Sequence, residues 1–575
     1  MQERITIPYA IADFAELREG GYYYVDKTQF IPRIENYKAP TYLRPRRFGK
    51  SLYVSMLAYY YDIDATDRFE QLFSGTYIGS NPTPEHNQYM VLRLDFSQLR
   101  VGDTMGDMEE NFNKLVCPLL KGFTHGGRGY PHFFKDFTFS DEHNAVAMLN
   151  DILAWIRYQS GVPQLYILID EYDNATNQMI TAYKDDLYKD ITSKESFFRT
   201  FFKSIKAGLG EGLVRRCFCT GVLPITIDDL TSGYNIAEFL SLRPNFIEMM
   251  GFTHEEAAAY LHYVIDNYGG EKISFEDIWS LLIDNYDGYR FRPNARPLFN
   301  PTILTYFFKY FAELNGEIPD ELIDNNLRTD IGWIRRLTDT MENAHEMLNR
   351  LIADEELLYA AADLQSRFGS TTLKNSNFYP IALFYLGMTT LKSGSIMILP
   401  NLTMRSIYMD YYNEIYDVHY DAYRQLAVYS AFADNRQLEP LVENFFEEYI
   451  RILPAQVFDK INENFVRCAF FWLSSRYINS YFSFAIEPNF PSGRPDLVMK
   501  GLPGTSFHND CRVVEFKYFK AKDEIIVEAL TAPREEDIAQ VKGYAADINR
   551  QFVNYKMRTY VVYMVTNKRC KVWEV

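Results

Sequence analysis

The sequence lacks several features that mark whole classes of protein. Its 575 residues include six cysteines, which are scattered without the paired spacing of a zinc site or a disulfide framework. The longest apolar runs, such as Leu165 to Ile169, are far too short to span a bilayer, and the N-terminus has no hydrophobic signal region. Low-complexity tracts and solenoid repeats are absent as well. We therefore expect a cytoplasmic protein with no membrane partner, built from packed modules.

Basic residues are in deficit over the whole chain, which has a formal net charge of −17. Nucleic-acid binding depends on clustered Lys and Arg, so this balance argues superficially against such a partner. The acidic excess, however, is concentrated in the N-terminal two-thirds. Residues 451–575 contain 18 Lys and Arg against 14 Asp and Glu. The C-terminal end therefore remains open to binding DNA or RNA.

The chain is long enough for several folding units, because single cores stop growing well below 575 residues. Up to about residue 232, short apolar runs alternate with helical stretches, which predicts a parallel sheet flanked by helices. Thr253 to Glu256 predicts a capped helix start. The predicted units are an α/β core at 1–250, a helical lid or connector at 251–375, a winged-helix-like connector at 376–419 and a second α/β unit at 420–575.

A phosphate-binding pattern lies between the first predicted strand and the helix after it. Gly49, Lys50 and Ser51 match the end of the G-x-x-x-x-G-K-[ST] pattern, whose first glycine is replaced here by Arg44. In this pattern backbone N–H groups cradle phosphates, the lysine pairs with the outer phosphates and the hydroxyl binds Mg²⁺. The predicted nucleotide-binding residues in this loop are Arg46, Arg47, Phe48, Gly49, Lys50 and Ser51.

Paired acids at the end of a buried strand supply the second half of this site. The apolar run from Leu165 ends in Asp170 and Glu171. We expect Asp170 to hold Mg²⁺ together with Ser51, and Glu171 to polarise the attacking water. The alternative is a polar strand end that faces solvent. Thr220 ends another apolar strand, where it could sense the γ-phosphate or simply begin a turn.

An arginine finger cannot be assigned from the sequence. Surface exposure is the default explanation for any single arginine, and a finger can also come from a second subunit of a homo-oligomer. The candidates in this chain are Arg199, Arg215, Arg216 and Arg243.

A second group of acids lies on three predicted strands near the C-terminus. Residues 483–488 and 495–499 predict a hairpin, and residues 512–519 predict a third strand. Side chains two apart on a strand share one face, so Glu515 and Lys517 point together. Phosphodiester cleavage needs Mg²⁺ or Mn²⁺ held by oxygen ligands, while a lysine orients the water and stabilises charge. The predicted ligands are Glu487, Asp496, Glu515 and the Phe516 carbonyl, with Glu463 as an auxiliary. The alternative for Glu515 and Lys517 is an exposed ion pair.

Several short segments occur in a fixed order over nearly the whole chain. They are Tyr24 to Thr28, Arg44 to Ser51, Leu94 to Ser97, Leu168 to Asp173, Thr220 to Val222, Ser232 to Asn235, Tyr286 to Tyr289 and Phe299 to Pro301. With the C-terminal acids they resemble the bacterial AAA-ATPase-like proteins that carry a C-terminal PD-(D/E)XK nuclease domain. In that family the first loop glycine is commonly replaced, as at Arg44.

The resemblance implies a role for one more helix. Gln540 and Tyr544 lie one turn apart on the helix predicted at 536–548. In PD-(D/E)XK domains such a helix flanks the site, so Gln540 resembles a residue that positions phosphate. The fold class that we expect is α/β: a P-loop NTPase sheet flanked by helices, a lid and connector, and a restriction-endonuclease-like C-terminal domain.

The expected function combines two activities in one chain. One is ATP binding with hydrolysis, and the other is Mg²⁺-dependent cleavage of phosphodiester bonds, first of all in DNA. The alternative is a regulatory switch that is controlled by nucleotide and whose nuclease-like domain binds nucleic acid without cutting it.

Overall fold

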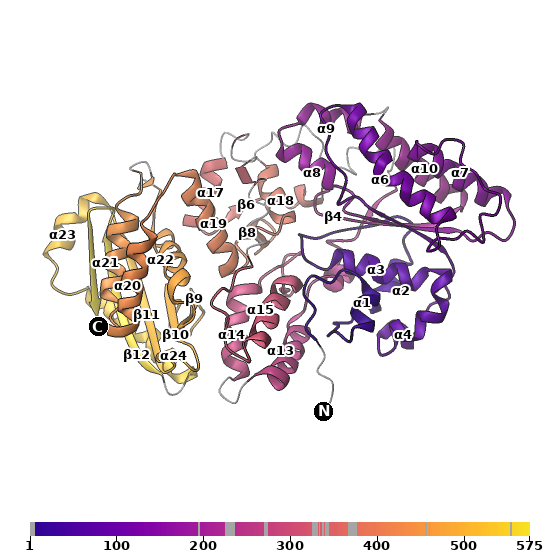
Figure 1. Cartoon of the computed structure of the whole chain (residues 1–575). Helices are drawn as coiled ribbons and strands as arrows, with labels where there is room; N and C mark the ends of the chain where they lie inside the picture. The colour runs from indigo at the N-terminus through magenta and orange to yellow at the C-terminus, as the bar shows by residue number, and fades with distance from the viewer. Residues whose placement is uncertain are drawn as a thin grey trace.

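The computed structural model describes residues 6–193, 196–224, 236–269, 274–324, 332, 334–335, 339, 344–365, 377–454, 457–458, 460–552 and 555–575. Two five-stranded sheets lie toward opposite ends of the molecule, and a group of helices with a small three-stranded sheet lies between them (Figure 1). Among the described helices, none is long and apolar enough to cross a membrane.

The N-terminal sheet is parallel throughout and has the strand order β2-β3-β4-β1-β5. Its strands are β1 (Pro40–Leu43), β2 (Met90–Asp95), β3 (Leu165–Asp170), β4 (Val214–Gly221) and β5 (Glu238–Phe239). Every residue of β1 and β3 is buried, as in a parallel sheet that is covered on both faces. This confirms the parallel sheet predicted from the alternating apolar runs.

Helices cover this sheet on both sides (Figure 1). Helix α3 (Lys50–Tyr61) follows β1 directly and packs against β3, while α10 (Phe197–Glu211) packs against β4 from the other side. Helices α6 (Met105–His125) and α7 (Ala145–Tyr158) join α10 in one layer. The connection from β1 into α3 therefore carries the predicted phosphate-binding loop at the carboxyl edge of the sheet.

In the first part of the predicted lid region, helices α13 (His254–Tyr268), α14 (Phe275–Tyr286) and α15 (Pro301–Glu313) pack together. The predicted capping box is present: Thr253 accepts a hydrogen bond from the Glu256 N–H at 3.2 Å, and the Glu256 carboxylate accepts one from the Thr253 N–H at 2.8 Å. This local signal thus fixes where α13 begins.

The unit predicted as a winged-helix-like connector contains a helix, a hairpin and a helix, namely α18 (Phe378–Tyr385), β7 (Thr390–Leu391), β8 (Ile396–Ile398) and α19 (Leu402–Ile415). A short strand from upstream, β6 (Leu357–Leu358), pairs with β8, after helix α17 (Ala344–Ala353). Buried connector residues such as Phe384 and Tyr408 belong to the same hydrophobic core as the N-terminal sheet. The unit limits predicted from the sequence stay predictions.

The C-terminal sheet is mixed and has the order β13-β12-β11-β10-β9. Only β11 and β12 are parallel to each other. The strands are β9 (Phe482–Ile486), β10 (Leu497–Gly501), β11 (Asp510–Phe519), β12 (Lys556–Val565) and β13 (Arg569–Glu574). The predicted hairpin is β9 and β10, and the predicted third strand is β11.

Alternation along β11 sends side chains to two separate cores. Val514 and Phe516 pack with helix α22 (Glu463–Ile478) on one face, whereas Cys511 and Val513 pack with α24 (Glu535–Gln551) on the other. The helices α20 (Ala422–Asn435) and α21 (Glu439–Phe445) complete the layer on the α22 side. The sheet is thereby enclosed, and charged side chains on its inner faces need partners.

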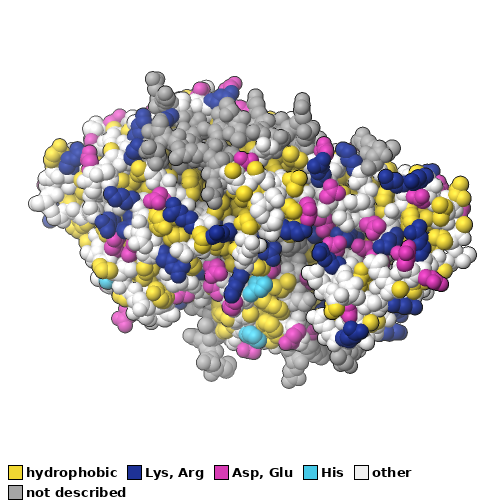
Figure 2. Space-filling view, turned by 180° about the vertical axis from the view of Figure 1, so that it is seen from behind, with side chains coloured by type: hydrophobic (Ala, Val, Ile, Leu, Met, Phe, Trp, Pro, Cys, Tyr) yellow, Lys and Arg dark blue, Asp and Glu magenta, His cyan; other side chains and the backbone are white. Residues whose placement is uncertain are grey.

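The surface carries both signs of charge close together. In Figure 2 basic and acidic side chains are interspersed over the visible face, between apolar and uncharged polar groups. Such a mixed surface gives weak long-range attraction to a polyanion, so any binding of nucleic acid on this face depends on local sites.

Candidate functional sites

The phosphate-binding loop runs from Arg44 to Gly49, between β1 and α3. Arg47 and Gly49 have left-handed backbone angles, with φ of 70° and 87°. Gly49 is the N-cap of α3 and provides no side chain to bond the first N–H groups of the helix. The N-terminus of a helix attracts anions through these N–H groups and the helix dipole. Arg46 and Ser51 are half-buried beside this helix start.

Lys50 points back into the loop. Its Nζ donates to the carbonyls of Arg44 at 3.0 Å and Pro45 at 2.9 Å. Burial lowers the pKa of Lys50, and the nearby acids Glu171 and Asp170 oppose this effect. The ammonium group is thus held by uncharged carbonyls, which a phosphate oxygen can replace as a stronger acceptor.

Arg44, which stands where the pattern has glycine, has a structural position. Its guanidinium donates to the carbonyls of Ser241 and Ile247, both at 2.9 Å, and lies over the ring of Phe291 at 3.7 Å from the centroid. The side chain is 1% exposed. Arg44 therefore ties the start of the loop to the 241–247 segment, which accounts for a large side chain at this position.

Asp170 and Glu171 lie at the carboxyl edge of the sheet. The Thr220 hydroxyl donates to Asp170 Oδ1 across from the neighbouring strand β4, and the Glu171 N–H donates to the same oxygen at 3.0 Å. Burial raises the pKa of Glu171, an effect that the Lys50 charge opposes. The structure thus brings Lys50, Asp170, Glu171 and Thr220 together, as the sequence predicted.

Asp173 is an organising residue that the sequence analysis did not single out, although it ends the same acidic run. It is 1% exposed and accepts from the N–H groups of Val222 at 3.0 Å and Leu223 at 2.7 Å. Gly221 passes so close that a Cβ there would lie 2.5 Å from Asp173 Oδ1. Asp173 therefore fixes the chain just after Thr220.

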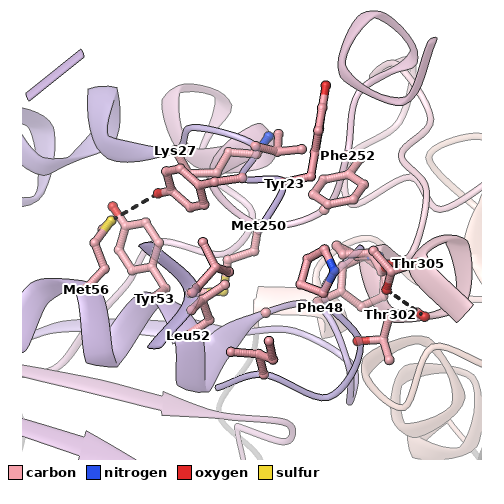
Figure 3. Close-up of a pocket in the computed structure, with 18 of the residues that line it drawn as sticks. Tyr23, Lys27, Phe48, Leu52, Tyr53, Met56, Met250, Phe252, Thr302 and Thr305 are labelled. Atoms are coloured by element: carbon pink, nitrogen blue, oxygen red, sulfur yellow. Dashed lines mark hydrogen bonds between the residues drawn. The ribbon is translucent and has the colours of Figure 1, made fainter. Parts of the chain in front are cut away.

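A cavity of about 140 Å³ lies beside α3 (Figure 3). Side chains from segments far apart in the sequence line it, among them Tyr23, Leu52, Tyr53, Met250, Phe252 and Thr305. Within the described part of the chain, the buried hydroxyls of Tyr53 and Tyr260 on this cavity have no hydrogen-bond partner. The cavity thus combines apolar walls with two unsatisfied polar groups, which is typical of a small-molecule site.

Residues of α15 and of the segment around Tyr289 hold the phosphate-binding loop in place. The Thr302 hydroxyl, in the first turn of α15, donates to the Arg47 carbonyl at 2.9 Å. The Phe48 ring meets Tyr289 and Phe291 edge-on at 5.2 and 5.4 Å. Of the segments that the sequence showed in order, Tyr286 to Tyr289 therefore contacts this loop directly. The segment from Ser232 to Asn235 lies outside the described residues.

Two of the four arginine-finger candidates lie at the wrong edge of the sheet. Arg215 and Arg216 stand at the start of β4 and pair with Glu85, at 2.6 Å for Arg215, whereas Thr220 and Asp170 lie at the opposite, carboxyl edge. Arg243 pairs with Glu238 at 3.4 Å. Arg199 is buried in α10.

The C-terminal acids converge at the junction of β10, β11 and α22. Asp496 accepts from the Phe516 N–H at 2.7 Å. Lys517 Nζ donates to Glu515 Oε1 at 2.8 Å and lies 3.8 Å from Glu463 Oε2. Asp496 and Glu515 are 7% and 3% exposed, so the alternative of an exposed ion pair does not describe Glu515 and Lys517.

Glu515 carries a buried oxygen, Oε2, for which the described residues supply no partner. Burial and the charge of Asp496 raise the pKa of Glu515 to about 7. Burial likewise raises the pKa of Asp496. An unsatisfied carboxylate oxygen beside a second carboxylate fits a hard divalent cation, which would neutralise both. The residues present thus suit a cation held by Asp496 and Glu515.

The other predicted ligands are arranged differently. Glu487 Oε1 accepts a hydrogen bond from Arg467 at 2.6 Å. Arg467 also bonds Oδ1 of Asp496, whereas the Phe516 N–H bonds the other oxygen of that carboxylate, Oδ2. No group of three or more His, Cys, Asp or Glu side chains in the described ranges is arranged to hold a metal ion. Glu487 and the Phe516 carbonyl as ligands stay predictions.

Gln540 is half-buried on α24 and donates to Tyr544 Oη at 2.7 Å. The Tyr544 ring in turn packs on Gly493, whose φ is 131° and where a Cβ would lie 3.1 Å from the ring. Ser492 is bonded to Asp547 of the same helix at 2.7 Å through its N–H. Gln540 and Tyr544 thus support the hairpin turn that leads to Asp496, and contact with phosphate stays a prediction.

Comparison with known proteins identifies two domains in this chain. A family model described as "Predicted AAA-ATPase" matches residues 8–231, and one described as "PD-(D/E)XK nuclease superfamily" matches residues 461–574. The "Uncharacterized protein in vnfD 5'region" of Azotobacter chroococcum mcd 1 is 25% identical over 308 residues, which are 53% of this chain and 52% of that protein. The chain thus spans about half the length of this curated relative. The chain joins an AAA-ATPase-like domain to a C-terminal domain of the PD-(D/E)XK nuclease superfamily.

Proposed function

We propose that the protein binds and hydrolyses ATP at the 44–51 loop and cleaves phosphodiester bonds, first of all of DNA, at Asp496, Glu515 and Lys517. The observation that carries the nuclease half is the buried Glu515 Oε2, which has no hydrogen-bond partner among the described residues and lies beside a second buried carboxylate and a lysine. The observation that supports the nucleotide half is Lys50, held by two loop carbonyls next to Asp170 and Glu171.

The nucleotide site would work by exchange of partners. Lys50 leaves the carbonyls of Arg44 and Pro45 and pairs with the outer phosphates, while N–H groups at the start of α3 bind their oxygens. Ser51 and Asp170 would hold Mg²⁺, which neutralises phosphate charge. Glu171, whose pKa is raised by burial, accepts the proton of the attacking water, and Thr220 keeps Asp170 in position.

The cavity beside α3 would receive the base of the nucleotide. Gly49 and Leu52 line both the cavity and the start of the phosphate-binding helix, so one ligand can reach both. A flat ring packs well between apolar and aromatic walls, and its ring nitrogens can satisfy the Tyr53 and Tyr260 hydroxyls. This supports a nucleotide rather than inorganic phosphate as the ligand.

The cleavage site would use Asp496 and Glu515 to hold Mg²⁺ or Mn²⁺. The ion supplies a water of lowered pKa and neutralises charge on the scissile phosphate. Lys517, already bonded to Glu515, orients that water and stabilises the charge that develops on the phosphate. Glu463 and the Lys517 ammonium hold each other near the same point.

The proposal is tested with the purified full chain and end-labelled DNA and RNA. Cleavage should require a divalent cation and should disappear in Asp496→Ala, while ATP turnover disappears in Lys50→Ala and Glu171→Gln. Intact DNA and RNA in all combinations of Mg²⁺, Mn²⁺ and ATP, with no difference between wild type and Asp496→Ala, would refute the nuclease half.

A second candidate is a nucleotide-controlled switch whose C-terminal domain binds nucleic acid without cutting it. It is favoured by Arg467, whose guanidinium forms ion pairs with Asp496 and Glu487 in this arrangement. A binding-only protein should retain DNA in a gel-shift assay and give no products after long incubation with Mn²⁺. In both cases we propose a cytoplasmic protein. If a second subunit supplies the arginine finger, the protein is a homo-oligomer.

A further inference from the structure

Arg467 is a buried cation wedged against the nuclease site. It lies on α22, one turn after Glu463, and its side chain is 2% exposed. One nitrogen, Nη1, lies 2.6 Å from Glu487 Oε1 and 3.0 Å from Asp496 Oδ1. A carboxylate that we propose as a ligand of the divalent cation is therefore already paired with an internal cation.

The other side of Arg467 belongs to a different part of the chain. Its Nη2 forms an ion pair at 2.9 Å with Oε1 of Glu355, which follows α17 in the connector region. Glu355 is shared with Arg405 of α19, and both are largely buried. Burial alone would raise the pKa of Glu355, but the two guanidinium groups lower it to about 2, so it is charged at neutral pH.

The backbone around Glu355 is held from the nuclease side. Glu355 has a φ of 58°, in the left-handed region. The side-chain amides of Asn462 and Asn464, at the start of α22, both donate to the Ala353 carbonyl at 2.7 Å. The connector and α22 are thus joined at this turn, and any shift between them changes the Glu355–Arg467 distance.

The neighbouring unit at 376–419, which Arg405 of α19 joins to Glu355, also abuts the phosphate-binding loop. Gly387, which follows α18, has a φ of 77°, and a Cβ at this position would lie 2.7 Å from Pro45 Cβ. The unit of α18, β7, β8 and α19 therefore contacts the nucleotide site at Pro45 and supplies Arg405, which pairs with Glu355. The two proposed sites share one packed neighbour.

We propose that Arg467 limits the affinity of the Asp496–Glu515 site for a divalent cation, and that Glu355 of the connector sets how strongly it does so. This rests on the proposed function. The Arg467 guanidinium repels an incoming cation and occupies one oxygen of Asp496. The negative charge of Glu355 partly offsets the positive charge of Arg467 and so weakens this repulsion. A movement of the connector that separates Glu355 from Arg467 thereby weakens metal binding.

The test measures Mn²⁺ bound to the full chain by electron paramagnetic resonance, without nucleotide. All variants carry Asp170→Asn, so that the N-terminal site adds no bound ion. Arg467→Gln should tighten Mn²⁺ binding about tenfold, since removal of one nearby charge is worth at least that much in a half-buried site. Glu355→Gln should weaken it about threefold, because Arg467 then acts on Asp496 alone.

Matched controls separate charge from folding. Arg512→Gln removes another fully buried arginine of the C-terminal domain, which lies on β11 and pairs with Asp510, and should leave Mn²⁺ affinity unchanged. Glu356→Gln, next to Glu355 but paired with Lys392, should do likewise. Arg467→Lys keeps the charge and should stay close to wild type, which serves if Arg467→Gln fails to fold.

Each outcome decides the matter. If Asp496→Asn with Glu515→Gln leaves Mn²⁺ binding intact, the proposed metal site is wrong and the inference falls with it. Loss of Mn²⁺ binding in the double variant instead supports the metal site. If Arg467→Gln then binds Mn²⁺ with wild-type affinity, with or without a change in Glu355→Gln, only the inference is overturned. Opposite shifts in the two variants support it.

Discussion

The two sites hold their charged groups in different ways. In the N-terminal site the charges are paired with backbone groups: Lys50 and Arg44 with carbonyls, and Asp173 with N–H groups. In the C-terminal site charged side chains pair with one another, as Arg467 does with Asp496 and Lys517 with Glu515. A site fixed by backbone groups is ready for a charged ligand, whereas a site of paired side chains must first release an internal partner.

The largest effect should come from the C-terminal site. Asp496→Ala removes one proposed ligand and leaves Arg467 without its partner there, so DNA cleavage should fall by at least about a thousandfold. The measurement is the initial rate on labelled DNA with Mn²⁺. Glu536→Ala, an exposed acid on α24, is the control and should cleave normally. A rate within threefold of wild type for Asp496→Ala would place the chemistry elsewhere.

The second-largest effect should come from the N-terminal site, whose charged groups are held by the backbone. Lys50→Ala removes a charged donor to phosphate, so ATP affinity should fall about tenfold to a hundredfold. Isothermal titration with ATP and Mg²⁺ gives the value. Lys114, exposed on α6, supplies the control Lys114→Ala, with unchanged affinity expected. Equal affinities in Lys50→Ala and wild type would show that the loop does not bind phosphate.

Arg44 separates loop support from ligand binding. Arg44→Met leaves the carbonyls of Ser241 and Ile247 without their donor, which should destabilise the protein by about 3 kcal/mol. At the size of this domain that corresponds to a melting temperature about 8 °C lower. The folded protein should still bind ATP within about threefold of wild type. If melting is unchanged while ATP binding is lost, Arg44 contacts the nucleotide instead of supporting the loop.

The smallest effect concerns pH. Glu355 has a pKa of about 2 in the folded protein against an ordinary glutamate value of 4.5, so its contribution to stability is present above pH 4.5 and is lost as pH falls toward 2. The stability difference between wild type and Glu355→Gln should shrink by about 1 kcal/mol from pH 7 to pH 4. Thermal melts of both proteins over this range measure it. A difference that grows on acidification would contradict the sign.

Parts of both sites were predictable from the sequence, because they follow from the periodicity of side chains along single strands. The buried run from Leu165 predicted β3 and brought Asp170 to the strand end, and the two-residue repeat on β11 predicted that Glu515 and Lys517 share a face. Both are local consequences of strand geometry. The capped start of α13 at Thr253 is local too.

The rest depends on contacts between distant segments. The cavity beside α3 needs Tyr23, Tyr53 and Met250, which come from three separate parts of the chain. Arg467 meets Glu355 across more than a hundred residues, and no local pattern encodes that distance. A signal was nevertheless present: Arg467 interrupts an otherwise apolar stretch of α22, and a buried arginine requires acidic partners.

The position of Arg44 has a consequence for the order of the 44–51 loop before any ligand binds. The loop is anchored through the side chain of its first residue to a neighbouring segment, so it is ordered without ligand. The proposed binding of ATP would therefore not include the free-energy cost of ordering the loop. The Thr302 hydroxyl of α15 holds the same loop nearer its end, at the Arg47 carbonyl. An arginine in place of a glycine thus gives a loop that is held in one conformation before the proposed ligand binds.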